Sequence, residues 1–248
     1  MVYAQYRLGA ELIDAMPPDI KRTIGRFRQL YDMGLHGPQL LGFSGQGQKF
    51  LRQTGDVFFE RVCRAVRMDR SEGAMAYLYG LIAHYALSSI VEPFLHRTSE
   101  TLSINEGSIR TEFDRFLLEL DGKTPAFRYD RSRHIHLTPG ECETVAMFYP
   151  GISAGAVEKS AKRMARIMHQ PVLPAGSRRN LVVKMMELRR EGDYVMATRA
   201  DRRLKSTNQD LLRLYELAKN HYASLLDQIL IRLRKSVPFS PDFSLPMA

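Results

Sequence analysis

One long apolar stretch, from Tyr77 to Phe94, most limits how this chain can fold. Almost every residue in it is apolar, and a helix that is apolar on all sides is buried in a core. The stretch is too short and too rich in His, Ser and Glu for a membrane span, which needs about 20 apolar residues. Pro93 is expected to end the helix, because proline lacks an N–H and its ring clashes with the preceding turn. The stretch therefore predicts a buried central helix over Tyr77–Val91.

Three polar residues interrupt this stretch at helical spacing. His84, Ser88 and Glu92 are each four residues apart. On a helix of about 3.6 residues per turn they form one narrow stripe. A polar stripe inside a core costs stability unless each group has a partner. The stripe therefore marks the first candidate site.

Helical periodicity along the rest of the chain predicts an all-α fold. Strand signals are nearly absent, and apolar residues recur at the spacing of one helix face. We expect a single domain over residues 1–248, built as a multi-helix bundle around the central helix. Further helices are expected over Tyr3–Ala15, Ile20–Met33, Phe50–Arg70, Glu106–Leu120, Pro139–Tyr149, Ser153–His169, Leu181–Glu191 and Asn208–Arg234, with loops over His96–Asn105 and Thr124–Pro139 and an extended tail over 236–248 that packs across the body.

Net charge and cysteine content limit which partners and which cellular compartment are expected. The formal net charge of +9 is compatible with an anionic membrane surface or phospholipid as partner. No block of five or more like charges appears and no specific signal for nucleic acid is present, so the basic residues are interpreted as solvated helix faces. Cys63 and Cys142 are too few for a disulfide framework. The first residues contain no apolar signal-peptide region, so a cytoplasmic location is expected.

Three histidines outside the central stretch are interpreted as residues without a metal. His36 is expected on the surface of a loop. His134 and His136 form an HxH pair, but no third ligand lies nearby in the sequence, and zinc sites use three or four protein ligands.

Several short motifs in the first half of the chain resemble those of the zinc-dependent phospholipase C family. Gly80-Leu81-Ile82, His84-Tyr85 and Pro93 fit a helix motif in which this family binds zinc through a His, an Asp and a second His. Other similar stretches read YAQYRLG from Tyr3, GLHGPQ from Gly34, QTGDVFF from Gln53 and IRTEFDRFLL from Ile109. The resemblance runs from about Tyr3 to Leu118 and implies a phospholipase C-like helical bundle with a three-zinc site.

The positions that bind zinc in this family hold other residues in this chain, with one exception. His84 keeps its ligand, and the remaining positions of the former metal-site pocket hold Gln5, Gln39, Phe50, Ser88, Glu92, Glu106 and Arg110. An amide is a poorer ligand for a hard divalent ion than a carboxylate, and the guanidinium of Arg110 has no lone pair to donate. The resemblance therefore implies a degenerate metal site with no cofactor.

Three functions are compatible with the sequence. The first is a pseudoenzyme of phospholipase C ancestry, without catalysis, that acts as a scaffold or binding protein. The second is a phosphodiester or phospholipid hydrolase that uses one zinc or other divalent metal at a rebuilt site of His84, Glu92 and Glu106. The third is a basic module for an anionic membrane or nucleic acid, supported by net charge alone.

Arg110 offers a replacement for the charge of the missing metal. A carboxylate-lined pocket without zinc leaves buried anions uncompensated, which is costly. Arg110 follows Glu106 by four residues, the spacing at which helix side chains meet, and the resemblance places Glu92 in the same pocket. We predict that the guanidinium binds Glu106, Glu92 or both, with His84 close by, because its planar fork can bridge two carboxylates. The alternative is an exposed Arg110 paired weakly with Glu106.

Overall fold

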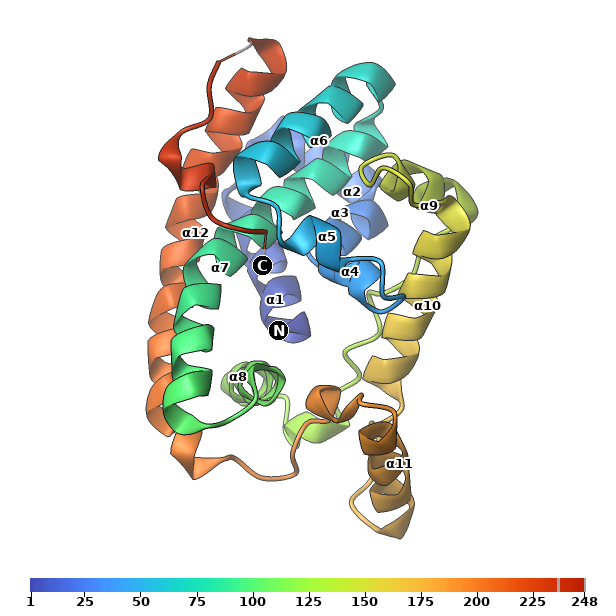
Figure 1. Cartoon of the computed structure of the whole chain (residues 1–248), viewed down its shortest axis with the longest axis vertical. Helices are drawn as coiled ribbons and strands as arrows, with labels where there is room; N and C mark the ends of the chain where they lie inside the picture. Colours follow the sequence, from blue (N-terminus) through green and yellow to red (C-terminus); the bar gives the residue numbers. More distant parts are fainter. Residues whose placement is uncertain (236, 248) are drawn as a thin grey trace.

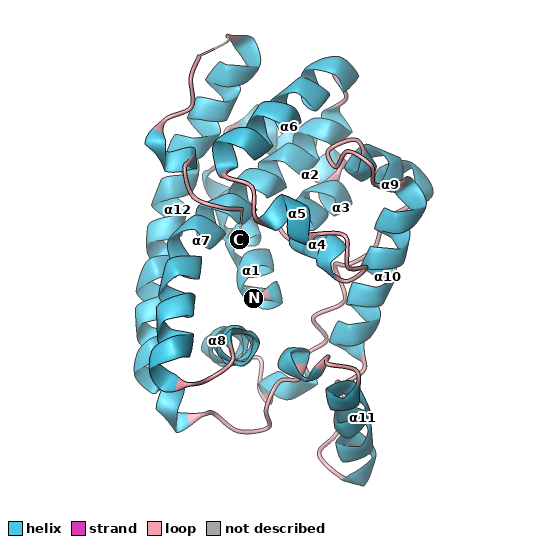
Figure 2. Cartoon of the chain, in the orientation of Figure 1, coloured by secondary structure: helices cyan, strands magenta, loops and turns pink. Residues whose placement is uncertain are grey.

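The structure is a computed structural model that describes residues 1–235 and 237–247, and its regular elements in these residues are helices without any strand (Figures 1 and 2). The expected all-α class is therefore confirmed. The α-helices are α1 (Val2–Ala15), α2 (Pro18–Arg26), α3 (Arg28–Gly34), α4 (Gln39–Gly42), α5 (Gln48–Leu51), α6 (Gly55–Asp69), α7 (Glu72–Leu102), α8 (Glu106–Leu120), α9 (Pro139–Ala146), α10 (Ala154–His169), α11 (Ser177–Leu188) and α12 (Lys205–Arg234). Short 3-10 turns are η1 (Ala126–Arg128), η2 (Gly192–Tyr194), η3 (Arg202–Leu204) and η4 (Pro241–Phe243).

The long helix α7 is the buried centre of the fold, as predicted. Its residues are buried without interruption from Ala76 to Ser89, and α3 and α12 pack along it most extensively. By length and composition α7 could also cross a membrane, but 89% of its most apolar window is buried inside the protein, as in a core helix.

Pro93 does not end this helix, contrary to the prediction. Helix α7 continues to Leu102, so most of the expected His96–Asn105 loop is helical. A proline inside a helix costs about 3 kcal/mol, which packing on either side can offset. Here Leu95 is fully buried just beyond the proline, and His96 Nδ1 lies 3.2 Å from Glu106 Oε1 on α8. These tertiary contacts hold the second part of the helix in place.

Two other expected helices are interrupted. The segment 20–33 breaks at Phe27, whose φ of −125° and ψ of 44° lie outside the helical region, and this residue separates α2 from α3. The segment 50–70 breaks between α5 and α6, because residues there pair with the tail instead. Gly55 N donates to Leu245 O at 2.9 Å, and Met247 N donates to Gln53 O at 2.9 Å.

The tail is extended around the η4 turn and packs across the body, as expected for its described residues; Ser236 and Ala248 lie outside them. Phe243 is fully buried and stacks on Tyr85 of α7 with ring centroids 5.6 Å apart. Tyr85 Oη lies 2.9 Å from Asp242 O, to which it donates a hydrogen bond. The end of the chain thereby reaches the middle of the central helix (Figure 1).

Helices α3 and α7 cross at two glycines. A Cβ atom on Gly80 would lie 2.2 Å from Tyr31 O, and one on Gly34 would lie 2.4 Å from Tyr77 O. Both obstacles are backbone atoms, which cannot rotate away as a side chain can. The two helices therefore approach at a distance that only glycine permits. This crossing positions the turn after α3, which carries Leu35 and His36 toward the central helix.

We expect Gly80→Ala to lower the free energy of unfolding by about 3 kcal/mol, because the added methyl group must separate two packed backbones. Gly25→Ala is the control, since Gly25 lies in α2 and a methyl group added there would meet nothing within 4 Å. It should be neutral or stabilising by up to about 1 kcal/mol. Urea denaturation of both variants tests this, and equal stabilities would contradict the close approach.

Candidate functional site

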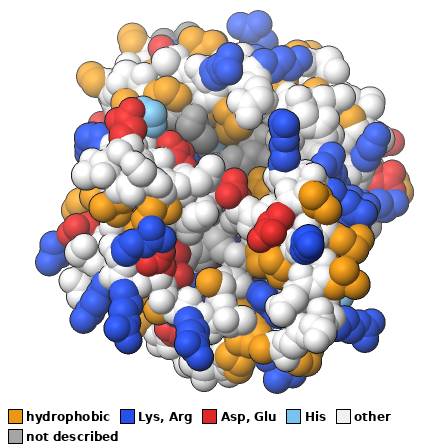
Figure 3. Space-filling model, turned by 60° about the horizontal axis from the view of Figure 1, so that its bottom comes forward, with side chains coloured by type: hydrophobic (Ala, Val, Ile, Leu, Met, Phe, Trp, Pro, Cys, Tyr) orange, Lys and Arg blue, Asp and Glu red, His pale blue; other side chains and the backbone are white. Residues whose placement is uncertain are grey.

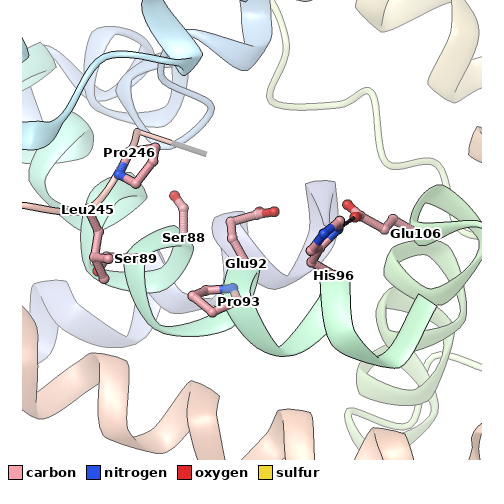
Figure 4. A pocket seen from close by; sticks show the side chains of 8 residues that line it. All are labelled: Ser88, Ser89, Glu92, Pro93, His96, Glu106, Leu245 and Pro246. Atoms are coloured by element: carbon pink, nitrogen blue, oxygen red, sulfur yellow. Dashed lines mark hydrogen bonds and ion pairs between the residues drawn. The ribbon is translucent and has the colours of Figure 1, made fainter. Parts of the chain in front are cut away.

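The polar stripe of α7 lies on one side of the buried helix, and each member has a partner. Ser88 Oγ donates to His84 O of its own helix at 2.5 Å. Glu92 is bound by Arg110 of α8. Figure 4 shows Ser88 and Glu92 side by side on α7, with His96 one turn further on against Glu106. The stripe is therefore satisfied within the chain.

Arg110 bridges the two carboxylates, as predicted. Its Nη1 lies 2.5 Å from Glu92 Oε1, and its Nη2 contacts both Glu92 Oε2 and, at 3.0 Å, Glu106 Oε2. The side chains of Arg110, Glu92 and Glu106 are 19%, 18% and 34% exposed. The contact with Glu92 is a bidentate fork, the geometry in which Arg–carboxylate pairs are strongest. The alternative of a solvent-exposed Arg110 is wrong.

The charges of this cluster reinforce one another. Burial alone would lower the pKa of Arg110, but its hydrogen bonds and attraction to Glu92, and then to Glu106, outweigh burial and raise it. Burial would raise the pKa of Glu106, and the hydrogen bonds from Arg110 and His96 lower it instead. The raised pKa of Arg110 and the lowered pKa of Glu106 both favour the charged forms of this pair.

His84 lies two turns before Glu92 and is completely buried. Its Nδ1 is 2.9 Å from Gln5 Nε2 and 3.2 Å from Leu35 O, and its Nε2 is 3.2 Å from Met247 O. Burial lowers the pKa of His84 to about 4, although the hydrogen bond to Leu35 O and the charge of Glu92 oppose this shift. The imidazole is therefore neutral at pH 7, and both of its nitrogens face protein atoms.

The other residues of the predicted pocket are only partly brought together. Gln5 meets His84, and Gln39 lines a cavity together with Arg110. Phe50 is buried elsewhere, with its ring against Tyr149 at 5.1 Å. The motif register that placed Phe50 in the pocket is therefore not supported by its position.

Two cavities flank the Arg110 cluster. The first, of about 330 Å³, is lined by Ser88, Ser89, Glu92, Pro93, His96, Glu106 and the tail residues Leu245 and Pro246 (Figure 4). The second, of about 260 Å³, lies between α1, α4 and α8 and is lined by Arg110, Asp114, Arg131 and Gln39 among others. Because Arg110 borders one cavity and its two carboxylates the other, the ion cluster forms the wall between them.

Asp114 is a site residue that was not predicted from the sequence. Its carboxylate accepts from Val2 N and Ala4 N at 2.9 Å each and from Arg131 Nη1 at 3.2 Å. It thereby caps the first turn of α1, whose N–H groups have no partner within the helix. Asp114 follows Arg110 by four residues on α8, so helical spacing could have revealed it.

The histidines after α3 also differ from their interpretation. His36 is buried rather than exposed, and its Nε2 lies 2.8 Å from Nε2 of His134. Burial first, and then the neighbouring ring, lowers the pKa of His36 well below its ordinary value, and burial lowers that of His134 to about 3. The two rings form a neutral hydrogen-bonded pair.

The side chains of residues 1–235 and 237–247 assemble no metal site. Within these ranges no group of three or more His, Cys, Asp and Glu side chains could hold a metal ion. Glu92 and Glu106 bind Arg110, and His84 binds Gln5 and backbone carbonyls, so the three do not act as one ligand set.

Comparisons with known proteins identified no relative of this chain. It matches no family model, no curated protein and no solved structure. The chemistry of the site must therefore be inferred from its own geometry.

Arg110→Ala should lower the free energy of unfolding by about 3 kcal/mol, because it leaves two partly buried carboxylates without a counter-charge. Arg213→Ala is the matched control, since Arg213 pairs with Asp210 on the exposed face of α12. That variant should change stability by less than about 1 kcal/mol. Chemical denaturation at pH 7 measures both, and a near-neutral Arg110→Ala would contradict a buried bridge.

Stability should fall by about 2 kcal/mol from pH 7 to pH 5 through His84 alone. The unfolded chain takes up a proton near pH 6.5, whereas the folded state resists it until about pH 4, so the contribution is present above 6.5 and is lost toward 4. His84→Gln should make the pH dependence of unfolding shallower by this amount, while His36 and His134, whose pKa values burial also lowers, still contribute. Parallel slopes for wild type and His84→Gln would refute this.

Proposed function

We propose that this chain is a pseudoenzyme of zinc-dependent phospholipase C ancestry that acts as a scaffold or binding protein. The proposal rests on the bridge that Arg110 forms between Glu92 and Glu106, the positions to which the sequence resemblance assigned metal ligands. A guanidinium can replace the positive charge of a metal and organise two carboxylates through its fork of donors. It keeps the pocket folded without the ion.

A guanidinium cannot replace the chemistry of zinc. A zinc ion generates a nucleophile by lowering the pKa of bound water and polarises the phosphoryl oxygen. Arg110 has no lone pair or vacant coordination position for either task, and its terminal nitrogens are already bound to carboxylates. His84 is a poor general base, because its folded pKa of about 4 leaves little driving force for taking a proton.

The position of the tail supports the same proposal. Met247 O faces His84 Nε2 at 3.2 Å, and Leu245 and Pro246 form one side of the cavity next to Glu92. A phospholipid head group approaching from this side would have to displace a segment held by backbone hydrogen bonds to Gln53 and Gly55.

The hydrolase alternative, with one metal at His84, Glu92 and Glu106, is not favoured by any specific contact. A metal ion could bind between the carboxylates only if the Arg110 side chain moved away. That movement would cost free energy, because it would separate a buried cation from its two anionic partners. The metal content and the hydrolytic activity of the purified protein distinguish the two functions directly.

Wild-type protein purified without chelators should contain no stoichiometric zinc and should not hydrolyse a choline phospholipid or a chromogenic phosphodiester. The resemblance implies His at positions 5 and 106, Asp at position 88 and Glu at position 110. Restoring these four of the implied ligands with Gln5→His, Ser88→Asp, Glu106→His and Arg110→Glu should add zinc binding, because it removes the cation and supplies ligand atoms. Elemental analysis measures the metal, and Arg110→Gln alone is the control that opens the pocket without new ligands. Robust zinc-dependent hydrolysis by the wild type would overturn the proposal.

A further inference from the structure

The positive charge of this protein is concentrated in one segment. Residues 159–205 contain thirteen Lys and Arg residues and only four Asp and Glu residues, a net charge of +9. The rest of the chain contains 23 of each kind and is neutral overall. This segment runs from α10 through α11 to the start of α12, and most of its basic side chains are exposed. The basic character is therefore local rather than spread over the surface.

Helix α11, in the middle of this segment, projects from the body at the lower end of the molecule (Figure 1). It is fastened on one side only. Arg179 Nη2 donates to Met196 O at 2.6 Å, Met186 is buried, and Glu191 N donates to Met186 O at 2.8 Å. Among the described helices and turns, α11 packs mainly against the short η2 turn. The opposite side of α11 faces solvent.

That outer side carries a stripe of large apolar residues. Leu181, Met185 and Leu188 are 62%, 43% and 79% exposed, and they recur at i, i+4 and i+7. At about 100° per residue they share one face, with Arg178 and Lys184 on its two edges. A helix that is apolar on two faces is normally covered on both. Figure 3 turns this end forward and shows hydrophobic side chains beside Lys and Arg.

We propose that α11 docks on an anionic lipid membrane, with Leu181, Met185 and Leu188 entering the interface and the surrounding Lys and Arg side chains contacting lipid phosphates. An apolar stripe edged by basic residues is the pattern of helices that lie in a membrane interface. Each Lys or Arg near an anionic surface adds attraction that weakens with salt. This inference uses no residue of the Arg110 pocket, so it stands or falls separately from the proposed function.

Charge decides against the other occupants of this face. A second copy would place two segments of net charge +9 opposite each other, which is repulsive. Nucleic acid would satisfy the basic residues but would leave the apolar stripe without a role, since phosphate contacts are polar. A membrane with anionic lipids matches both features at once.

The test is flotation of the 248-residue chain with vesicles of phosphatidylcholine alone or mixed with phosphatidylserine. Wild-type protein should bind the mixed vesicles, bind the neutral ones far more weakly, and dissociate as salt is raised. Leu181→Ser/Met185→Ser/Leu188→Ser should weaken binding at least roughly tenfold, because the apolar insertion is lost. These side chains are exposed, so the variant should remain folded, which circular dichroism checks.

A matched control variant replaces the same number of exposed apolar side chains on other surfaces. Val57→Ser/Met68→Ser/Leu217→Ser replaces three similarly exposed apolar residues outside the segment and should bind like wild type. No binding to the mixed vesicles, or equal losses in the two triple variants, would overturn the proposal. A wild-type dimer in solution that becomes a monomer in the α11 triple variant would also overturn it, because the occupant of the face would then be a second copy of the chain.

The charge arm of the test uses pairs of exposed basic residues. Lys184→Gln/Arg189→Gln should weaken vesicle binding and reduce its salt dependence, whereas Arg22→Gln/Arg52→Gln should change neither. DNA binding is measured with the same variants. The membrane proposal would also be contradicted if the protein bound DNA of any sequence as tightly as vesicles and the α11 triple variant did not change that binding.

Discussion

The carboxylates of Glu92 on α7 and Glu106 on α8 share one counter-charge, the guanidinium of Arg110. Glu92 comes from the central helix, while Glu106 and Arg110 come from one turn of the next. Helix α7 continues past Pro93, so His96 as well as Glu92 reaches this cluster, and His96 contacts Glu106. The contact of the two helices and the electrostatics of the pocket therefore depend on the same residues.

Other polar groups of the pocket are also paired within the chain, except Gln5 Oε1, which is buried without a hydrogen-bond partner among the described residues. Asp114 is balanced by Arg131 and by the first N–H groups of α1, and buried His84 remains neutral between Gln5 and two backbone carbonyls. The tail supplies one of those carbonyls. The polar groups of this pocket are thus organised by an arginine, an amide and backbone atoms.

The central helix could be predicted from one apolar stretch, and the contact of Arg110 with Glu106 from helical spacing. Glu92 as the second partner of Arg110 was expected only from the resemblance, because Glu92 lies on a different helix. The continuation past Pro93 could not, since it depends on how Leu95 and His96 pack against distant residues. The burial of His36 depends on His134, 98 residues away. The excess of Lys and Arg around α11 can be counted in the sequence, but only the structure shows which face of that helix is exposed to solvent.

The proposed replacement of a metal ion by the guanidinium of Arg110 can be tested by locating zinc. Crystals of the wild-type protein soaked in zinc and measured at the zinc absorption edge test it most directly, because anomalous scattering locates the ion without assumptions about activity. We expect no zinc peak between Glu92 and Glu106, with Arg110 bound to both. A zinc ion coordinated by these carboxylates, with Arg110 turned away, would contradict it.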